Sequence, residues 1–178
     1  MNLNNSDFYI LKNNIASISD IVDHIYHLTE AEVVISDSLG LALAIHSGKN
    51  SQSGYFCFQK DELFQHCFNS LNQILSLTHT FGKYDGICWA GMRVTQRKVS
   101  INDNIFFCKI EKYLLDSDPK VINEEQVKQH NCTPDDTRHL HNIFETLPIL
   151  SQDRINELLD LMEICLIELH ANKQLISF

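Results

Sequence analysis

The sequence predicts an α+β fold in which one antiparallel sheet is flanked by helices. Three observations predict it. Apolar residues recur at helical spacing near both ends of the chain and once in its middle. Two pairs of short apolar runs surround turn-forming residues, which is typical of β-hairpins. The chain has 178 residues, the length of one ordinary domain, so we interpret residues 1–178 as a single domain.

The chain is expected to begin with a helix and a hairpin. Apolar residues three to four positions apart predict an N-terminal helix over residues 10–28, and Ser17 or Ser19 is expected to start part of it. Residues 32–36 and 41–45 are short apolar runs separated by an Asp-Ser-Leu-Gly turn. Because Asp and Gly supply turn chemistry, the two runs predict a hairpin.

A second helix and a second hairpin follow. Residues 58–77 have helix-like apolar spacing, and residues 82–86, which contain two glycines, break that pattern. Residues 87–101 and 105–115 are expected to be extended, with the turn between them at residues 102–104. The sequence therefore predicts helix, hairpin, helix and hairpin in this order.

The C-terminal third, residues 123–175, is predicted to be helical, and it follows the expected sheet and pocket region at residues 32–115. Thr133 and Pro134, followed by two aspartates, are typical of a helix start. A later proline ends that helix, and Ser151 is expected to cap the last one.

The last helix carries an apolar stripe wider than one core-facing helix needs. Two interpretations stay open: the helix is buried on two sides within its own chain, or it is shared with a second subunit. We expect a homodimer formed through the terminal helices. The residues predicted for its interface are Ile155, Leu158, Met162, Ile164 and Ile167.

Composition and charge disfavour several classes of partner. The chain has 14 Lys and Arg against 23 Asp and Glu, so its net charge is −9. Nucleic acid and anionic membranes are bound by basic surfaces, which makes direct binding of either unexpected. Since no 18-residue apolar run and no export signal is present, we expect no membrane span and a cytoplasmic protein with reduced cysteines.

No catalytic, metal or cofactor site is predicted. The pairs His24 and His27, and His139 and His141, lack the four-residue spacing of a helical zinc site. The chain has no C-x-x-C motif and no glycine-rich phosphate loop, and it contains only six glycines. We therefore expect no enzyme activity, no metal and no cofactor.

One region stands apart from the rest. Residues 86–92, together with Phe56, Cys57 and Cys67, gather three cysteines, aromatic side chains and the single tryptophan, Trp89. Small residues beside bulky ones are typical of a strand that borders a cavity, and they are equally typical of a well-packed core strand. From the residues alone, both interpretations stay open.

The run Cys-Trp-Ala-Gly-Met at residues 88–92 resembles the Cys-His-Ala-Gly-Leu motif of the PocR-type sensory domains, a PAS-related group found in bacterial regulators. Phe56-Cys57 and Cys67 are similar to the family's upstream cysteine positions, and the resemblance extends over roughly residues 12–175. Trp89 departs from the motif, since the family has histidine there. The resemblance implies a PAS-like sheet and a ligand-sensing domain, often fused to an AraC-type DNA-binding domain.

The expected function is a cytoplasmic sensory or regulatory domain of a bacterial transcriptional regulator. It would bind a small, mostly apolar molecule between the sheet and the helix at residues 58–77, and it would act on DNA only through a separate or missing output domain. The alternative is a ligand-free protein–protein interaction module with a filled pocket. The residues expected to bind the ligand are Phe56, Cys57, Phe58, Cys67, Cys88, Trp89 and Met92.

Overall fold

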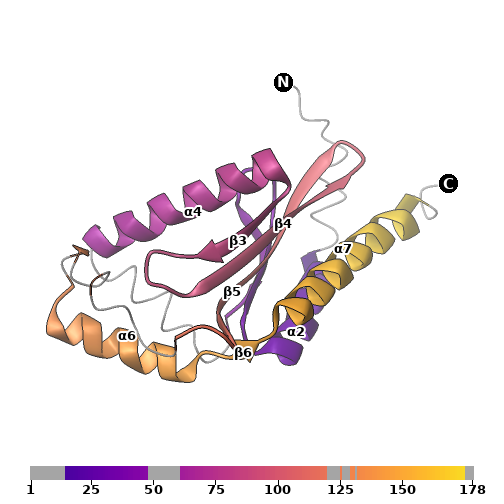
Figure 1. Cartoon of the computed structure of the whole chain (residues 1–178). Helices are drawn as coiled ribbons and strands as arrows, with labels where there is room; N and C mark the ends of the chain where they lie inside the picture. Colours follow the sequence, from indigo (N-terminus) through magenta and orange to yellow (C-terminus); the bar gives the residue numbers. More distant parts are fainter. Residues whose placement is uncertain (1–14, 48–60, 120–124, 126–128, 131, 175–178) are drawn as a thin grey trace.

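The structure is a computed structural model, which describes residues 15–47, 61–119, 125, 129–130 and 132–174 (Figure 1). It confirms the expected α+β, PAS-like arrangement of an antiparallel sheet with flanking helices. The helices are α2 (Ile15–Thr29), α4 (Asp61–Phe81), α6 (Pro134–Thr146) and α7 (Gln152–Gln174). The strands are β1 (Glu32–Ser36), β2 (Ala42–His46), β3 (Lys83–Ile87), β4 (Arg93–Ile101), β5 (Asn104–Leu115) and β6 (Ile149–Leu150).

The sheet has the strand order β2-β1-β5-β4-β3, and neighbouring strands along this path are antiparallel. β6 is the exception, because it pairs in parallel with the end of β5. Both predicted hairpins are present, β1 with β2 and β4 with β5. The second hairpin turns at Asn102, whose φ of 53° lies in the left-handed region that asparagine tolerates better than most residues.

The sequence predicts a break at residues 82–86 followed by one strand over residues 87–101, and the structure corrects this. It has two strands here, β3 and β4. Lys83 to Ile87 pair with β4, with Lys83 opposite Arg97 and Ile87 opposite Arg93. Residues 88–92 turn between the two strands instead of continuing one of them. The sequence Lys-Tyr-Asp-Gly-Ile contains residue types that are depleted in strands, so pairing with β4 decides its conformation.

A bulge in β5 determines which side chains face which side of the sheet. Val94 lies opposite Glu111 and Arg93 lies opposite Tyr113, so Lys112 is an extra residue, with a φ of 61°. The bulge lets Tyr113 remain in the core cluster that contains Ile110, although the two are three positions apart.

The larger core cluster lies between the sheet and the helices α2 and α7, which Figure 1 shows side by side on one side of the sheet. Ile155, Leu158 and Met162 belong to it and are 0%, 1% and 0% exposed. This corrects the expectation that these three residues form a dimer interface. Their side chains are buried in the chain's own core, where a second subunit would not reach them.

The outer side of α7 remains apolar in part. Leu161, Ile164 and Ile167 are 41%, 56% and 43% exposed. The first interpretation, that this helix is buried on two sides within its own chain, is therefore wrong for Ile164 and Ile167. The second interpretation, in which a second subunit covers this side of α7, stays open.

The two C-terminal helices begin where the sequence predicts. Thr133 and Asp136 form a reciprocal capping box at the start of α6. The Ser151 hydroxyl accepts a hydrogen bond from the backbone N–H of Arg154 at the start of α7. The first helix differs from the expectation, because α2 begins at Ile15 and both proposed starting serines lie inside it. No described helix has the length and apolar character needed to cross a membrane.

Candidate functional site

A second, smaller core cluster brings together all four of the predicted ligand-binding residues that the structure describes. Cys67 from α4, Cys88 and Trp89 from the turn after β3, and Met92 before β4 all belong to it. Phe56, Cys57 and Phe58 lie outside the described residues. The other members of the cluster come from the same turn, from β5, and from α6 and its flanks. They are Ala90, Leu114, Cys132, Leu140, Ile143, Phe144 and Leu147.

The turn at residues 88–92 holds this cluster in place. The N–H of Cys88 donates to the Met92 carbonyl over 2.9 Å, and the N–H of Gly91 donates to the Cys88 carbonyl over 2.9 Å. Gly91 has a φ of 88°, a conformation that glycine adopts without strain. Because the turn is this tight, it projects Ala90 and Met92 into the core and leaves Trp89 partly buried.

The thiols of Cys88 and Cys108 are unsuited to nucleophilic chemistry. Burial raises the pKa of Cys88 to about 11, although the N–H groups of Ala90 and Met92 oppose the shift. Burial also raises the pKa of Cys108, in the larger core cluster, to about 12. Since the thiolate is the reactive form, both thiols are protonated and unreactive at neutral pH. The described cysteines 67, 88, 108, 132 and 165 are all free of disulfides.

Two histidines join Trp89 in a group of three aromatic rings. The His66 ring, on α4, lies 4.2 Å from the ring of His130 and 6.0 Å from that of Trp89, centroid to centroid. The His130 and Trp89 rings are 5.3 Å apart in an edge-to-face arrangement. Sequence reasoning missed both histidines, because neither lies in a motif and only the tertiary structure brings them together.

Buried charges form a second feature that the sequence did not indicate. On β1, the Glu32 carboxylate accepts a hydrogen bond from Lys112 Nζ over 2.6 Å. On β5, Lys109 Nζ lies 2.9 Å from the Glu111 carboxylate. Glu32 and Glu111 lie opposite each other in the antiparallel register and are 7% and 8% exposed. The group of four is therefore largely sheltered from water, and its charges compensate one another.

The two carboxyl groups titrate as a linked pair. The pKa of Glu32 is raised to about 7, because burial and the neighbouring Glu111 together raise it by more than Lys112 lowers it. Burial alone would also raise the pKa of Glu111. The ammonium groups of Lys109 and Lys112 and a hydrogen bond from Glu32 outweigh it, so that the pKa of Glu111 is lowered to about 2. At neutral pH, Glu111 is the ionised member and Glu32 changes charge.

The charged group and the cysteine cluster are electrostatically connected. The Glu111 carboxylate contributes to the raised pKa of Cys88, and so does the Cys67 thiol. Glu111 follows Ile110, which faces the larger core cluster, and so its own side chain projects from the other side of the sheet. A molecule bound beside Cys88 would therefore meet apolar and sulfur-containing side chains, with a charged group close by.

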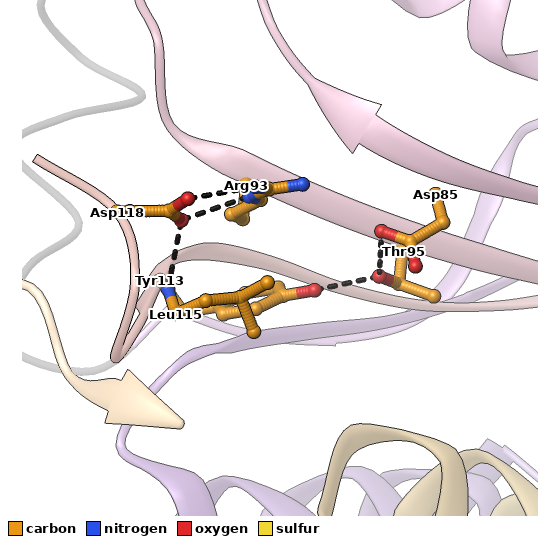
Figure 2. A network of polar contacts seen from close by, with 6 residues as sticks. All are labelled: Asp85, Arg93, Thr95, Tyr113, Leu115 and Asp118. Carbon is orange, nitrogen blue, oxygen red and sulfur yellow. Dashed lines mark hydrogen bonds and ion pairs between the residues drawn. The ribbon is translucent and has the colours of Figure 1, made fainter. Parts of the chain in front are cut away.

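Figure 2 shows a further polar network that anchors the end of β5. Arg93 donates to both carboxylate oxygens of Asp118, over 2.8 and 2.7 Å. The same carboxylate accepts a hydrogen bond from the backbone N–H of Leu115 over 2.8 Å. The hydrogen bond from Arg93 lowers the pKa of Asp118. This bidentate pair keeps the segment after β5 against β4.

The buried Tyr113 hydroxyl in the same view lies 2.6 Å from the Thr95 hydroxyl, which in turn donates to Asp85 over 3.3 Å (Figure 2). Burial raises the pKa of Tyr113 to about 12, so the phenol is neutral at physiological pH. The network thus satisfies a buried hydroxyl and stabilises the sheet, without supplying a catalytic base.

No group of three or more His, Cys, Asp or Glu side chains within the described ranges is arranged to hold a metal ion. The chemistry that the region offers is apolar packing, ring contacts and buried ion pairs. A scan against protein-family models and a search of curated proteins both find no match to this chain.

Proposed function

We propose that the chain is a cytoplasmic sensory domain of a bacterial transcriptional regulator, resembling the PocR-type domains. It binds a small, mostly apolar molecule beside the turn at residues 88–92, between α4 and the sheet. It performs no catalysis itself. The bound molecule changes the packing of α4 and of the terminal helices, and dimerisation carries the change to a separate DNA-binding domain.

One observation carries the proposal. Cys67, Cys88, Trp89 and Met92, chosen from the sequence motif and its surroundings, converge in one core cluster from two separate elements. The apolar and polarizable side chains of such a cluster suit a small apolar ligand. The protonated thiol of Cys88 favours binding over covalent chemistry at this position.

Contacts between β4, the following hairpin turn and α7 supply a route for the signal. The Arg97 guanidinium, on β4, pairs with the carboxylates of Asp160 and Glu163 on α7. At the hairpin turn, the side-chain amide of Asn102 lies 2.8 Å from His170 Nε2. A ligand that displaces β4 therefore also moves α7, the helix whose outer side carries exposed isoleucines.

A protein–protein interaction module with a filled pocket is the second candidate. The rings of His66, Trp89 and His130 lie within 4.2 to 6.0 Å of one another, so they occupy the space that a ligand would need. In this case the exposed face of α7 would be the functional surface, and no small molecule would bind.

Native mass spectrometry of the protein purified from its own cells distinguishes the two candidates. The sensory proposal predicts a bound small molecule that survives gentle ionisation. Cys67→Trp, which fills the space beside the turn, should abolish this added mass. Gln65→Trp places the same side chain on the exposed side of α4 and should retain it. A wild-type protein that carries no added mass, and gains no thermal stability from any member of a small-molecule library, would contradict ligand sensing.

A further inference from the structure

We propose that the contact between His66 and His130 is a proton-sensitive switch: uptake of a proton by this pair separates α4 from the segment that leads into α6 and loosens the packing around Trp89. This regulation does not require a bound ligand and goes beyond the proposed sensing of an apolar molecule.

The geometry of His130 makes its neutral form the one that fits. Its Nδ1 atom is buried and has no hydrogen-bond partner in the described part of the chain. A neutral imidazole protonated at Nε2 leaves only a lone pair at Nδ1, whereas an imidazolium has an N–H at both nitrogens. Protonation would therefore create a buried donor without an acceptor, which disfavours the packed conformation.

The neighbouring ring adds electrostatic repulsion. The centroids of His66 and His130 are 4.2 Å apart, so two protonated rings in this arrangement would place like charges in contact. Burial lowers the pKa of His130, and His66 lowers it further. The packed conformation thus holds at neutral pH and is weakened as the pH falls below the ordinary histidine value of 6.5.

Other titratable groups in this region have distinct effects. Cys67 on α4, Cys88 on the turn and Cys132 before α6 belong to the same cluster. Burial raises the pKa of Cys88, so its thiol carries no charge between pH 5 and 7.5. The Glu32–Glu111 pair does titrate near neutrality and acts on Cys88, so an experiment must separate it from the histidines.

A change at His130 would reach two helices. His66 is on α4, and His130 lies just before Thr133, which caps α6. α6 in turn supplies Leu140, Ile143 and Phe144 to the cluster that surrounds Trp89. Releasing His130 from its ring contacts would therefore loosen α6 against the turn at residues 88–92.

Trp89 is the only tryptophan, so its fluorescence reports on this site alone. We expect the emission of the intact protein to change reversibly between pH 7.5 and 5, with a midpoint below 6.5. His66→Gln should move the midpoint to higher pH, because it removes the neighbouring imidazole. The double variant His66→Gln with His130→Gln should lose the transition. His24→Gln, an exposed histidine on α2, should retain the wild-type transition.

The outcomes separate the alternatives. A transition that persists in the double variant arises from other titratable groups, such as the Glu32–Glu111 pair, and overturns the proposal. Wild-type emission that is constant from pH 7.5 to 5 also overturns it. Should the variants fail to fold at pH 7.5, the His130 ring is followed by NMR in the wild-type protein. A His130 midpoint at or above 6.5, with unchanged amide exchange in α4 and α6, would then reject the switch.

Discussion

Trp89 occupies the position where the family that the motif resembles has histidine, and two histidines surround it in the folded chain. Its ring contacts His66 and His130 at centroid distances of 6.0 and 5.3 Å. In the folded chain, the imidazoles beside this tryptophan come from α4 and from His130 before α6. The aromatic content of the site is therefore contributed by three separate parts of the chain.

Replacing Trp89 by alanine should destabilise the fold. Fully buried Phe or Trp residues lose about 3–5 kcal/mol on truncation to alanine, and the partial burial of Trp89 places the expected loss near 2–3 kcal/mol. Urea unfolding followed by circular dichroism measures it. Ile87→Ala, at a neighbouring residue that is 47% exposed, should change the free energy of unfolding by less than about 0.5 kcal/mol. Equal losses in the two variants would show that Trp89 does not hold the cluster together.

Glu32 makes stability depend on pH. Its pKa is raised from 4.5 to about 7 in the folded chain, so between these values the folded state binds more protons than the unfolded state. This contribution to the free energy of unfolding is complete below pH 4.5 and is lost as the pH rises toward 7.

Glu32→Gln removes that dependence, since glutamine does not titrate. Between pH 5 and pH 8 the wild type should lose on the order of 1–3 kcal/mol of unfolding free energy that the variant does not lose. Chemical denaturation at several pH values measures it. Glu30→Gln, an exposed glutamate two positions away, should follow the wild-type curve. Parallel curves for Glu32→Gln and the wild type would contradict the raised pKa.

α6 shows how much one short sequence motif specifies. The pattern Thr-Pro-Asp-Asp predicts a helix start, and the structure places Thr133 as the N-cap with Asp136 completing the capping box. All the required groups lie within four residues, so their geometry depends little on the rest of the chain. The helix packs its buried residues, among them Leu140 and Phe144, against the turn that carries Trp89.

Thr133→Ala should weaken α6 by about 1 kcal/mol, because the hydroxyl that accepts from the Asp136 N–H is lost. Thermal unfolding measures the change, and amide exchange should show faster opening of the first turn of α6. Thr133→Ser keeps the hydroxyl and should restore most of the stability. A Ser variant as unstable as the Ala variant would assign the effect to lost packing instead of capping.

β3 and the turn after it show the opposite behaviour. β3 has exposed and partly buried residues in alternation, but its composition favours no strand. Its extended conformation follows from pairing with β4, and the turn at residues 88–92 follows from the hydrogen bonds between Cys88, Gly91 and Met92. The sequence thus assigned Cys88, Trp89 and Met92 to a strand, whereas a tight turn presents them.

The molecule as a whole leaves one apolar surface on α7 uncovered. Ile164 and Ile167 are 56% and 43% exposed, while Ile155, Leu158 and Met162 of the same helix are buried beneath them. One helix that packs on one sheet buries a single face, so the outer isoleucines gain nothing from burial within the chain. A two-fold pairing of α7 with its copy would bury them.

Ile164→Lys combined with Ile167→Lys should convert a dimer into a folded monomer, because burying unpaired charges is strongly unfavourable. Sedimentation at micromolar concentrations measures the change, and circular dichroism confirms that the fold is kept. Glu145→Lys makes the same kind of charge change at an exposed position of α6, away from α7, and should leave the dimer intact. A wild-type protein that sediments as a monomer at high micromolar concentration would reject dimerisation through α7.

The sequence by itself determined the elements whose signals are local. Apolar periodicity located α2, α4 and α7, although α2 begins at Ile15 instead of residue 10. The Thr-Pro-Asp-Asp pattern located the start of α6, turn residues located two hairpins, and Ser151 marked the start of α7. Only the tertiary structure decided β3, the bulge at Lys112, which face of α7 is buried, and the contact of His66 with His130. The ion pair of Glu32 with Lys112 joins residues 80 positions apart. Such pairs leave no periodic pattern, because they depend on how whole elements pack and not on the residues beside them.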